Sequence, residues 1–175
     1  MTHLEVAKQA AHQAGAFLRE HFGTALEVDE AKHHDIKLAL DRESQDLITR
    51  VLLTAFPDHA LYGEEGIAGN QESDYQWIVD PIDGTRDFIR GRPGWSVSVA
   101  LISAGRPLIG TLVAPARGEV WSAIAGQGSW RNGERLRAST RQQFSASRVP
   151  ADHLEADDRD LTCVYKPNSI ALRIA

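Results

Sequence analysis

The sequence predicts an α+β fold in which two N-terminal helices pack on a mainly antiparallel sheet. Apolar residues recur at helical spacing in two stretches near the N-terminus. From Leu61 onward the apolar runs become short, and Gly and Pro separate them. Because helices come first and a meander of strands follows, we expect the two kinds of element to form separate layers.

The first helix is expected to follow Thr2, because a threonine hydroxyl can accept hydrogen bonds from the backbone of a first helical turn. Gly23 is expected to end this helix. The stripe that predicts it consists of Leu4, Ala7, Ala11, Ala14, Leu18 and Phe22. We interpret the following stretch, which contains His33, His34 and Asp35, as a polar connection, since adjacent residues rarely converge on one metal ion.

A second helix is predicted to begin near Asp41, which is a suitable N-cap residue, and to end at Phe56 and Pro57. Its apolar stripe consists of Leu47, Ile48, Val51, Leu52 and Ala55. Strands are then expected over residues 75–79, 96–102, 108–114 and 119–125. Residues 104–107 and 115–118 are expected to connect hairpins, and Asn132-Gly133 to form a tight turn.

Residues 1–140 are predicted to form an N-terminal metal-binding α+β domain. Residues 141–175 are interpreted as a linker and the start of an incomplete C-terminal α/β domain. The polar stretch 138–160 is typical of a long loop, and an apolar helix is predicted to begin near Ile170. We therefore expect the chain to be the N-terminal portion of a longer protein, or to find its other half elsewhere.

Composition excludes several classes of function. The net charge is −5 and no basic stripe is present, which disfavours nucleic-acid binding. The one cysteine, Cys163, excludes a disulfide framework and is expected to be a buried thiol. No apolar run is long enough to cross a membrane. These features favour a cytoplasmic protein.

The most informative motif is the run from Trp77 to Thr85, which reads WIVDPIDGT. It ends in Asp80 and Asp83, and a Gly-Thr pair follows. Upstream, Gly63-Glu64-Glu65 follows a second short apolar run. Mg²⁺ prefers oxygen ligands from a few carboxylates, and backbone N–H groups of a Gly-Thr turn can hold an anion. The alternative is an ordinary solvated turn, since Asp-Pro and Asp-Gly are common turn formers.

These two motifs, in this order and spacing, resemble the inositol monophosphatase family of Mg²⁺-dependent phosphatases. The resemblance runs from the first helix to about Leu136. It implies the first half of a layered αβαβα phosphatase fold. It also implies that Mg²⁺ is bound by Glu64, Asp80, Asp83 and the main-chain carbonyl of Ile82.

The resemblance further assigns water activation to Thr85 with help from Asp41, while Glu64 also serves catalysis. It implies that the N–H groups of Gly84 and Thr85 hold phosphate oxygens. The family has a Thr-rich lead-in before Asp41 that this chain lacks. Lys37 stands in that lead-in and is expected either to bind anionic substrate or to be a surface lysine.

The favoured interpretation is a Mg²⁺-dependent phosphomonoesterase acting on a small sugar phosphate such as inositol monophosphate. One alternative is a 3′(2′),5′-bisphosphate nucleotidase, and Asp87, where the family often has Asn, leaves the subfamily open. The other alternative is a non-catalytic metal-binding fragment that lacks the second half of the active site. The expected partners are a small phosphorylated substrate and either a second copy of the chain or the missing C-terminal half.

Overall fold

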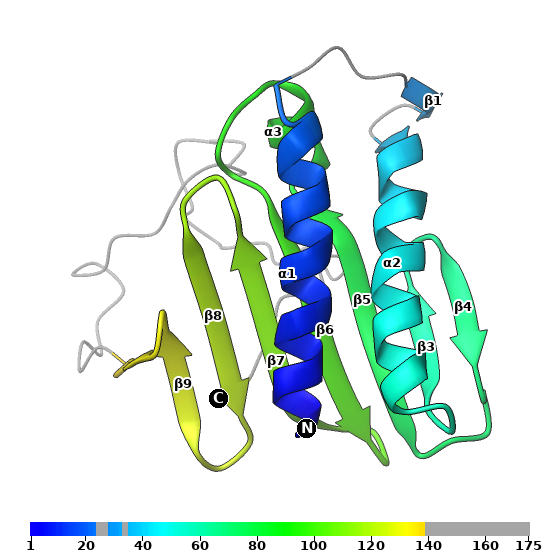
Figure 1. Ribbon diagram of the computed structural model, residues 1–175, viewed down its shortest axis with the longest axis vertical. Coiled ribbons are helices and arrows are strands. Elements are labelled where there is room, and N and C mark those ends of the chain that lie inside the picture. Colours follow the sequence, from blue (N-terminus) through cyan, green and yellow to red (C-terminus); the bar gives the residue numbers. More distant parts are fainter. Residues whose placement is uncertain (24–27, 33–34, 139–175) are drawn as a thin grey trace, which may run out of the picture. The chain divides into compact units, whose positions relative to one another are not determined.

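The computed structural model describes residues 1–23, 28–32 and 35–138, and residues 1–136 belong to one compact unit. Two long helices, α1 (His3–His21) and α2 (Ala39–Ala55), cover one face of a large sheet (Figure 1). A short helix, α3 (Thr85–Ile89), lies at one end of that sheet. The expected α+β layering of two helices on a mainly antiparallel sheet is confirmed.

The sheet has eight strands in the order β10-β9-β8-β7-β6-β5-β3-β4. In chain order they are β3 (Ala60–Gly63), β4 (Gly66–Gly69), β5 (Tyr75–Asp83), β6 (Ser96–Ser103), β7 (Arg106–Ala114), β8 (Glu119–Ile124), β9 (Gly128–Arg131) and β10 (Glu134–Arg135). All neighbours pair antiparallel except β3 and β5, which pair parallel. Strands β1 (Val28–Lys32) and β2 (Asp35–Leu38) form a separate two-stranded sheet.

The core lies between the helices and the sheet. Helix α1 presents small residues to it, among them Ala7, Ala10 and Ala14, which are fully buried. Small side chains let a helix approach its neighbours closely, so α1 can pack on both α2 and strands β6 and β7. The sheet contributes alternate residues, because strand side chains point to opposite faces in turn. The apolar residues of β5 and β6 with 0% of their surface exposed are Trp77, Val79, Val97, Val99 and Leu101.

A stack of rings closes the core at the end where α1 begins and α2 ends. This ring cluster consists of His3, Phe56, His59, Tyr75 and Trp77. The His59 ring lies nearly parallel to those of Phe56 and Tyr75, with centroids 4.9 Å away in both cases. His59 is 8% exposed, and its Nδ1 is buried without a hydrogen-bond partner.

Several local expectations hold. Thr2 caps α1 in a capping box with Glu5, and Gly23, with a φ of 79°, follows the Phe22 C-cap. Asn132 and Gly133 both have positive φ and join β9 to β10, as a type I′ turn requires. The strands predicted from residue 75 to residue 125 are all present.

Other expectations are wrong. Helix α2 begins at Ala39, so Asp41 lies inside its first turn and is not the N-cap. The stretch expected as a polar connection contains the strands β1 and β2. Strands β3, β4, β9 and β10 were not among the predicted strands. The expected linker and C-terminal elements, including Cys163, lie outside the described residues.

Candidate metal and phosphate site

The parallel pairing of β3 with β5 brings the two acidic motifs together. Gly63 is paired with Val79, so the next residues, Glu64 just after β3 and Asp80 within β5, lie side by side. The Glu64 backbone N–H donates to the Val79 carbonyl at 3.2 Å, which continues the ladder by one step. Because parallel strands end at the same edge, two motifs that are distant in sequence become neighbours.

A bulge in β5 brings Asp83 to the same face as Asp80. In a regular strand, residues three apart point to opposite faces. Here Asp80 pairs with Ser98 and Asp83 pairs with Ser96, so three steps along β5 match two along β6. Since Ser96 and Ser98 share a face, their cross-strand partners share it too. Pro81 fits at this bulge because it cannot donate a ladder hydrogen bond.

The electrostatics of this edge disfavour negative charge on Asp80. Burial raises the pKa of Asp80 to about 7, with further contributions from the charges of Asp83, Glu64 and Asp41, while a backbone hydrogen bond from Ile82 acts in the opposite direction. One of its carboxylate oxygens, Oδ1, is buried and has no hydrogen-bond partner. The pKa of Asp83 is also raised by desolvation. Although Asp83 contacts solvent over its own surface, the protein around it still removes part of its hydration.

This donor set suits a hard cation by its chemistry. A divalent ion would supply the opposite charge that the buried Asp80 oxygen lacks, and carboxylates are the ligands that Mg²⁺ prefers. Among the described residues, however, no three His, Cys, Asp or Glu side chains surround a common point as they stand. The convergence of Glu64, Asp80 and Asp83 on one ion therefore stays a prediction that requires side-chain rotation.

The turn after Asp83 is held by close backbone packing. Gly84 has a φ of 89°, and a Cβ there would lie 2.4 Å from the carbonyl oxygen of Gly94. Helix α3 then begins at Thr85. Phe88 anchors the helix edge-on against Trp95, with ring centroids 4.8 Å apart. Only glycine allows this approach, so the Gly-Thr pair has a structural role beside any role in binding.

Thr85 and Ile82 contact each other directly. The Thr85 hydroxyl donates to the Ile82 carbonyl at 2.9 Å. That carbonyl has a second lone pair and remains a possible metal ligand. The single hydroxyl proton of Thr85 is directed at Ile82, so the hydroxyl meets other groups here as an acceptor.

The remaining predicted residues come from the segment before and within α2. Asp41 is 4% exposed, and its charge acts on Asp80. Lys37 lies in β2, next to the start of α2. Its role in substrate binding stays a prediction.

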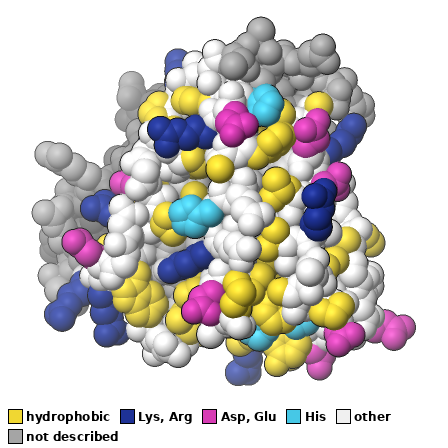
Figure 2. Space-filling model, viewed as in Figure 1, with side chains coloured by type: hydrophobic (Ala, Val, Ile, Leu, Met, Phe, Trp, Pro, Cys, Tyr) yellow, Lys and Arg dark blue, Asp and Glu magenta, His cyan; other side chains and the backbone are white. Residues whose placement is uncertain are grey.

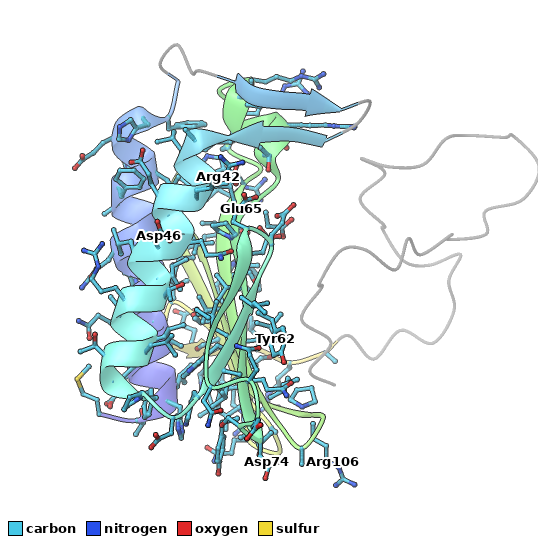
Figure 3. All side chains as sticks on the ribbon, turned by 90° about the vertical axis from the view of Figure 1, so that its right-hand side faces the viewer. Arg42, Asp46, Tyr62, Glu65, Asp74 and Arg106 are labelled. Atoms are coloured by element: carbon cyan, nitrogen blue, oxygen red, sulfur yellow. The ribbon has the colours of Figure 1, made fainter. Side chains whose placement is uncertain are left out.

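Two residues of α2 that the sequence did not indicate also belong to this region. Gln45 and Arg42 contact the turn between β3 and β4, which carries Glu64 and Glu65. In Figure 3, Arg42 and Glu65 lie close to each other at the upper end of the molecule. The available signal for Gln45 was its spacing of four residues from Asp41, since such residues share a helix face, but a polar helix residue is usually solvated. Arg42 directly follows Asp41, so its spacing gave no such signal.

The sequence model of the inositol monophosphatase family matches residues 2–163. The chain belongs to the inositol monophosphatase family. An Aquifex aeolicus protein named fructose-1,6-bisphosphatase/inositol-1-monophosphatase is 33% identical over 162 residues, which are 91% of this chain and 61% of that protein. A Haemophilus influenzae protein named Nus factor SuhB is 34% identical over 147 residues, or 82% of this chain and 55% of that protein.

Solved structures agree with the family assignment. An IMPase structure from Thermotoga maritima matches with a TM-score of 0.74 and 36% identity, and the match covers 80% of this chain and 55% of that one. The chain thus spans little more than half the length of these relatives. The observed layer of helices on a mainly antiparallel sheet is the corresponding part of the family fold.

Proposed function

We propose that this chain provides the metal-binding half of a Mg²⁺-dependent phosphomonoesterase. The observation that carries the proposal is the half-buried Asp80, whose Oδ1 has no partner and whose pKa of about 7 reflects burial and three nearby carboxylates. A folded protein that gathers such groups at the end of a rigid strand has reason to bind a cation there.

In this proposal Glu64, Asp80, Asp83 and the Ile82 carbonyl hold Mg²⁺. When bound, the ion would lower the pKa of a coordinated water and offset charge on the phosphate. The protein's own residues do the positioning. Strand β5 fixes Asp80, the bulge directs Asp83 to the same face, and the packing of Gly84 against Gly94 fixes the turn that follows.

Thr85 and Asp41 are proposed to orient the attacking water and to take its proton. Because the Thr85 hydroxyl donates to a carbonyl, it can accept a hydrogen bond from water but has no base to which it passes a proton. A carboxylate must therefore accept that proton, and Asp41 is the buried candidate. The backbone N–H groups of Gly84 and Thr85 are proposed to hold phosphate oxygens, and Lys37 to add positive charge to the substrate side.

The substrate class is proposed to be a small sugar phosphate such as inositol monophosphate. A bisphosphate nucleotidase remains the alternative within the class, because the matched relatives carry different names and the chain spans only part of each. A cytoplasmic location and assembly with a second copy or a C-terminal half also stay predictions. No helix among the described residues has the length and apolar character needed to cross a membrane.

The test is phosphate release by the full chain from inositol monophosphate, fructose 1,6-bisphosphate and 3′-phosphoadenosine 5′-phosphate, with and without Mg²⁺. Release that requires Mg²⁺ and is lost in Asp83→Asn is expected. Asp46→Asn is the matched control, because Asp46 is exposed on α2 and points away from the sheet (Figure 3).

The same set of substrates distinguishes an enzyme from a non-catalytic metal-binding fragment. Mg²⁺ binding without phosphate release from any substrate would favour the non-catalytic fragment. Absence of both binding and release would contradict the proposal as a whole.

A further inference from the structure

Gln45 makes the most specific polar contacts between α2 and the turn that carries Glu64. Its Oε1 accepts the backbone N–H of Glu65 at 2.8 Å, and its Nε2 donates to the Gly66 carbonyl at 3.2 Å. The side chain is 6% exposed. A buried amide that satisfies one donor and one acceptor of the same turn fixes the position of that backbone.

The turn is shaped to receive this side chain. A Cβ at position 63 would lie only 2.0 Å from Oε1 of Gln45, so a glycine at this position leaves the space that the amide fills. The neighbouring Arg42 adds a second contact, with its Nε 3.5 Å from Glu65 Oε2. Glu65 is nearly buried in that pair, with 5% of its side chain exposed, whereas Glu64 is exposed.

The two acidic residues of the turn therefore have different surroundings. Glu65 is used to attach the turn to α2, while the charge of Glu64 acts on Asp80. Gln45 lies one helical turn after Asp41, so both face the same side of α2. Helix α2 thus carries one carboxylate of the site, Asp41, and holds the backbone that directly follows another, Glu64.

We infer that Gln45 is a positioning residue that holds the Gly63–Gly66 turn so that Glu64 stays beside Asp80. The inference rests on the proposed metal role of Glu64. Gln45 does not touch the reacting atoms in this role. It acts through the backbone of Glu65 and Gly66, as partners of metal ligands commonly do.

The first measurement is amide hydrogen exchange by NMR on the full chain without metal. Gln45→Met fills similar space but removes both hydrogen bonds, and we expect exchange at the Glu65 amide to become at least about tenfold faster. The Asn70 amide, which donates to the His59 carbonyl at the other end of the same hairpin, is the internal reference and should stay within about twofold. Gln45→Glu keeps an acceptor for Glu65 and should restore most of its protection.

The second measurement is Mn²⁺ binding followed by electron paramagnetic resonance. Gln45→Met is expected to weaken binding by about tenfold, within the range seen when partners of metal ligands are removed. Gln71→Ala is the matched control, because Gln71 also donates to backbone carbonyls of this hairpin but at the end away from Glu64. It should leave the Mn²⁺ affinity unchanged.

The possible outcomes distinguish the proposed metal role of Glu64 from the positioning role of Gln45. Unchanged exchange at Glu65, equal acceleration at Asn70, or unchanged Mn²⁺ affinity in Gln45→Met would overturn the positioning role. If Glu64→Gln also leaves Mn²⁺ affinity unchanged, the proposed metal site fails, whatever the exchange data show. If Glu64→Gln weakens binding and Gln45→Met does not, the metal site stands and the inference about Gln45 fails.

Discussion

Each end of strand β5 buries a titratable group, and the two pKa values are shifted in opposite directions. At its start, Tyr75 and Trp77 join the ring cluster around His59, where burial and the charge of His3 lower the pKa of His59, and Asp58 acts in the opposite direction. At its end, burial and like charges raise the pKa of Asp80. In both places the protein interior disfavours the charged form.

The difference lies in what each group can do when it is neutral. A neutral imidazole stacks on aromatic rings and packs as part of the core, so the ring cluster needs no ligand. The acidic end gathers four carboxyl groups, because the charges of Asp83, Glu64 and Asp41 all act on Asp80 and oppose its ionisation. A cation relieves that repulsion, whereas packing cannot. Burial alone therefore does not mark a functional site, whereas burial together with accumulated like charge does.

The helical face of the molecule gives no comparable signal. In Figure 2, side chains of both signs are scattered over this face among apolar ones. The acidic end of β5 is distinguished by the desolvation of its carboxyl groups and not by the types of side chain on the surface.

The largest effect is expected from a substitution that removes a carboxylate at the acidic end of β5 and leaves the ring cluster at its other end intact. Asp80→Asn should weaken Mn²⁺ or Mg²⁺ binding by more than about 100-fold, because a direct ligand is expected to matter more than its outer partners. Titration calorimetry measures this. His59→Phe, at the other end of the same strand, should bind the ion as the unsubstituted chain does. Equal losses in both variants would mean that the effect is unfolding.

Gly84→Ala tests the backbone approach at the acidic end. The substitution combines a positive φ with a Cβ 2.4 Å from a backbone oxygen, so we expect a loss of roughly 3 kcal/mol or more in the free energy of unfolding. Gly91→Ala has a positive φ but open space around its Cβ, and should cost only about 1–2 kcal/mol. Urea denaturation compares the two. Similar costs would show that the contact with Gly94 does not matter.

Asp80→Asn should also stabilise the metal-free protein, in contrast to most buried substitutions. The raised pKa of Asp80 means that its native form binds more protons than the unfolded chain between about pH 4 and pH 7. Stability is therefore lost as the pH rises through that window, and the loss is complete above it. The full shift corresponds to on the order of 4 kcal/mol, which screening by water at this partly exposed site reduces to roughly 1–3 kcal/mol.

The measurement for this prediction is urea denaturation with EDTA at pH 4.5 and pH 8. The gain from Asp80→Asn should be small at pH 4.5 and close to its maximum at pH 8. A gain that does not change with pH would show that the carboxylate charge is not its cause.

The smallest expected effect concerns the ring end. The lowered pKa of His59 means that the unfolded chain takes up protons first as the pH falls below about 6.5, so stability decreases on the acid side. His59→Phe keeps the stack and removes the titration, so its stability should depend less on pH between 5 and 7. One proton changes the slope by at most about 1.4 kcal/mol per pH unit. Thermal unfolding at several pH values would reveal unchanged slopes if His59 does not titrate there.

The elements that could be predicted from the sequence are those that bury a regular pattern of apolar residues. Helix α1, the body of α2 and strands β5 to β8 each repeat apolar residues at a fixed period, so local spacing was enough to predict them. The sequence also indicated the two acidic motifs, because carboxylates directly follow short apolar runs in both. Strands β1, β2, β3, β4, β9 and β10 were not among the predicted strands. Short strands at or beyond the edge of a sheet need no such pattern, since β4 is mostly exposed.

Which polar residues come together depends on the tertiary structure and could not be predicted from the sequence. Glu64 lies beside Asp80 because β3 and β5 pair parallel in one register, and Asp83 shares a face with Asp80 because of a one-residue bulge. The sequence alone predicts that Gln45 is a solvated helix residue, because the turn that it contacts is distant in the chain. Pairing, register and burial arise from contacts between segments distant in the chain, so the pKa of Asp80 and the partners of Gln45 are properties of the fold and not of either motif alone.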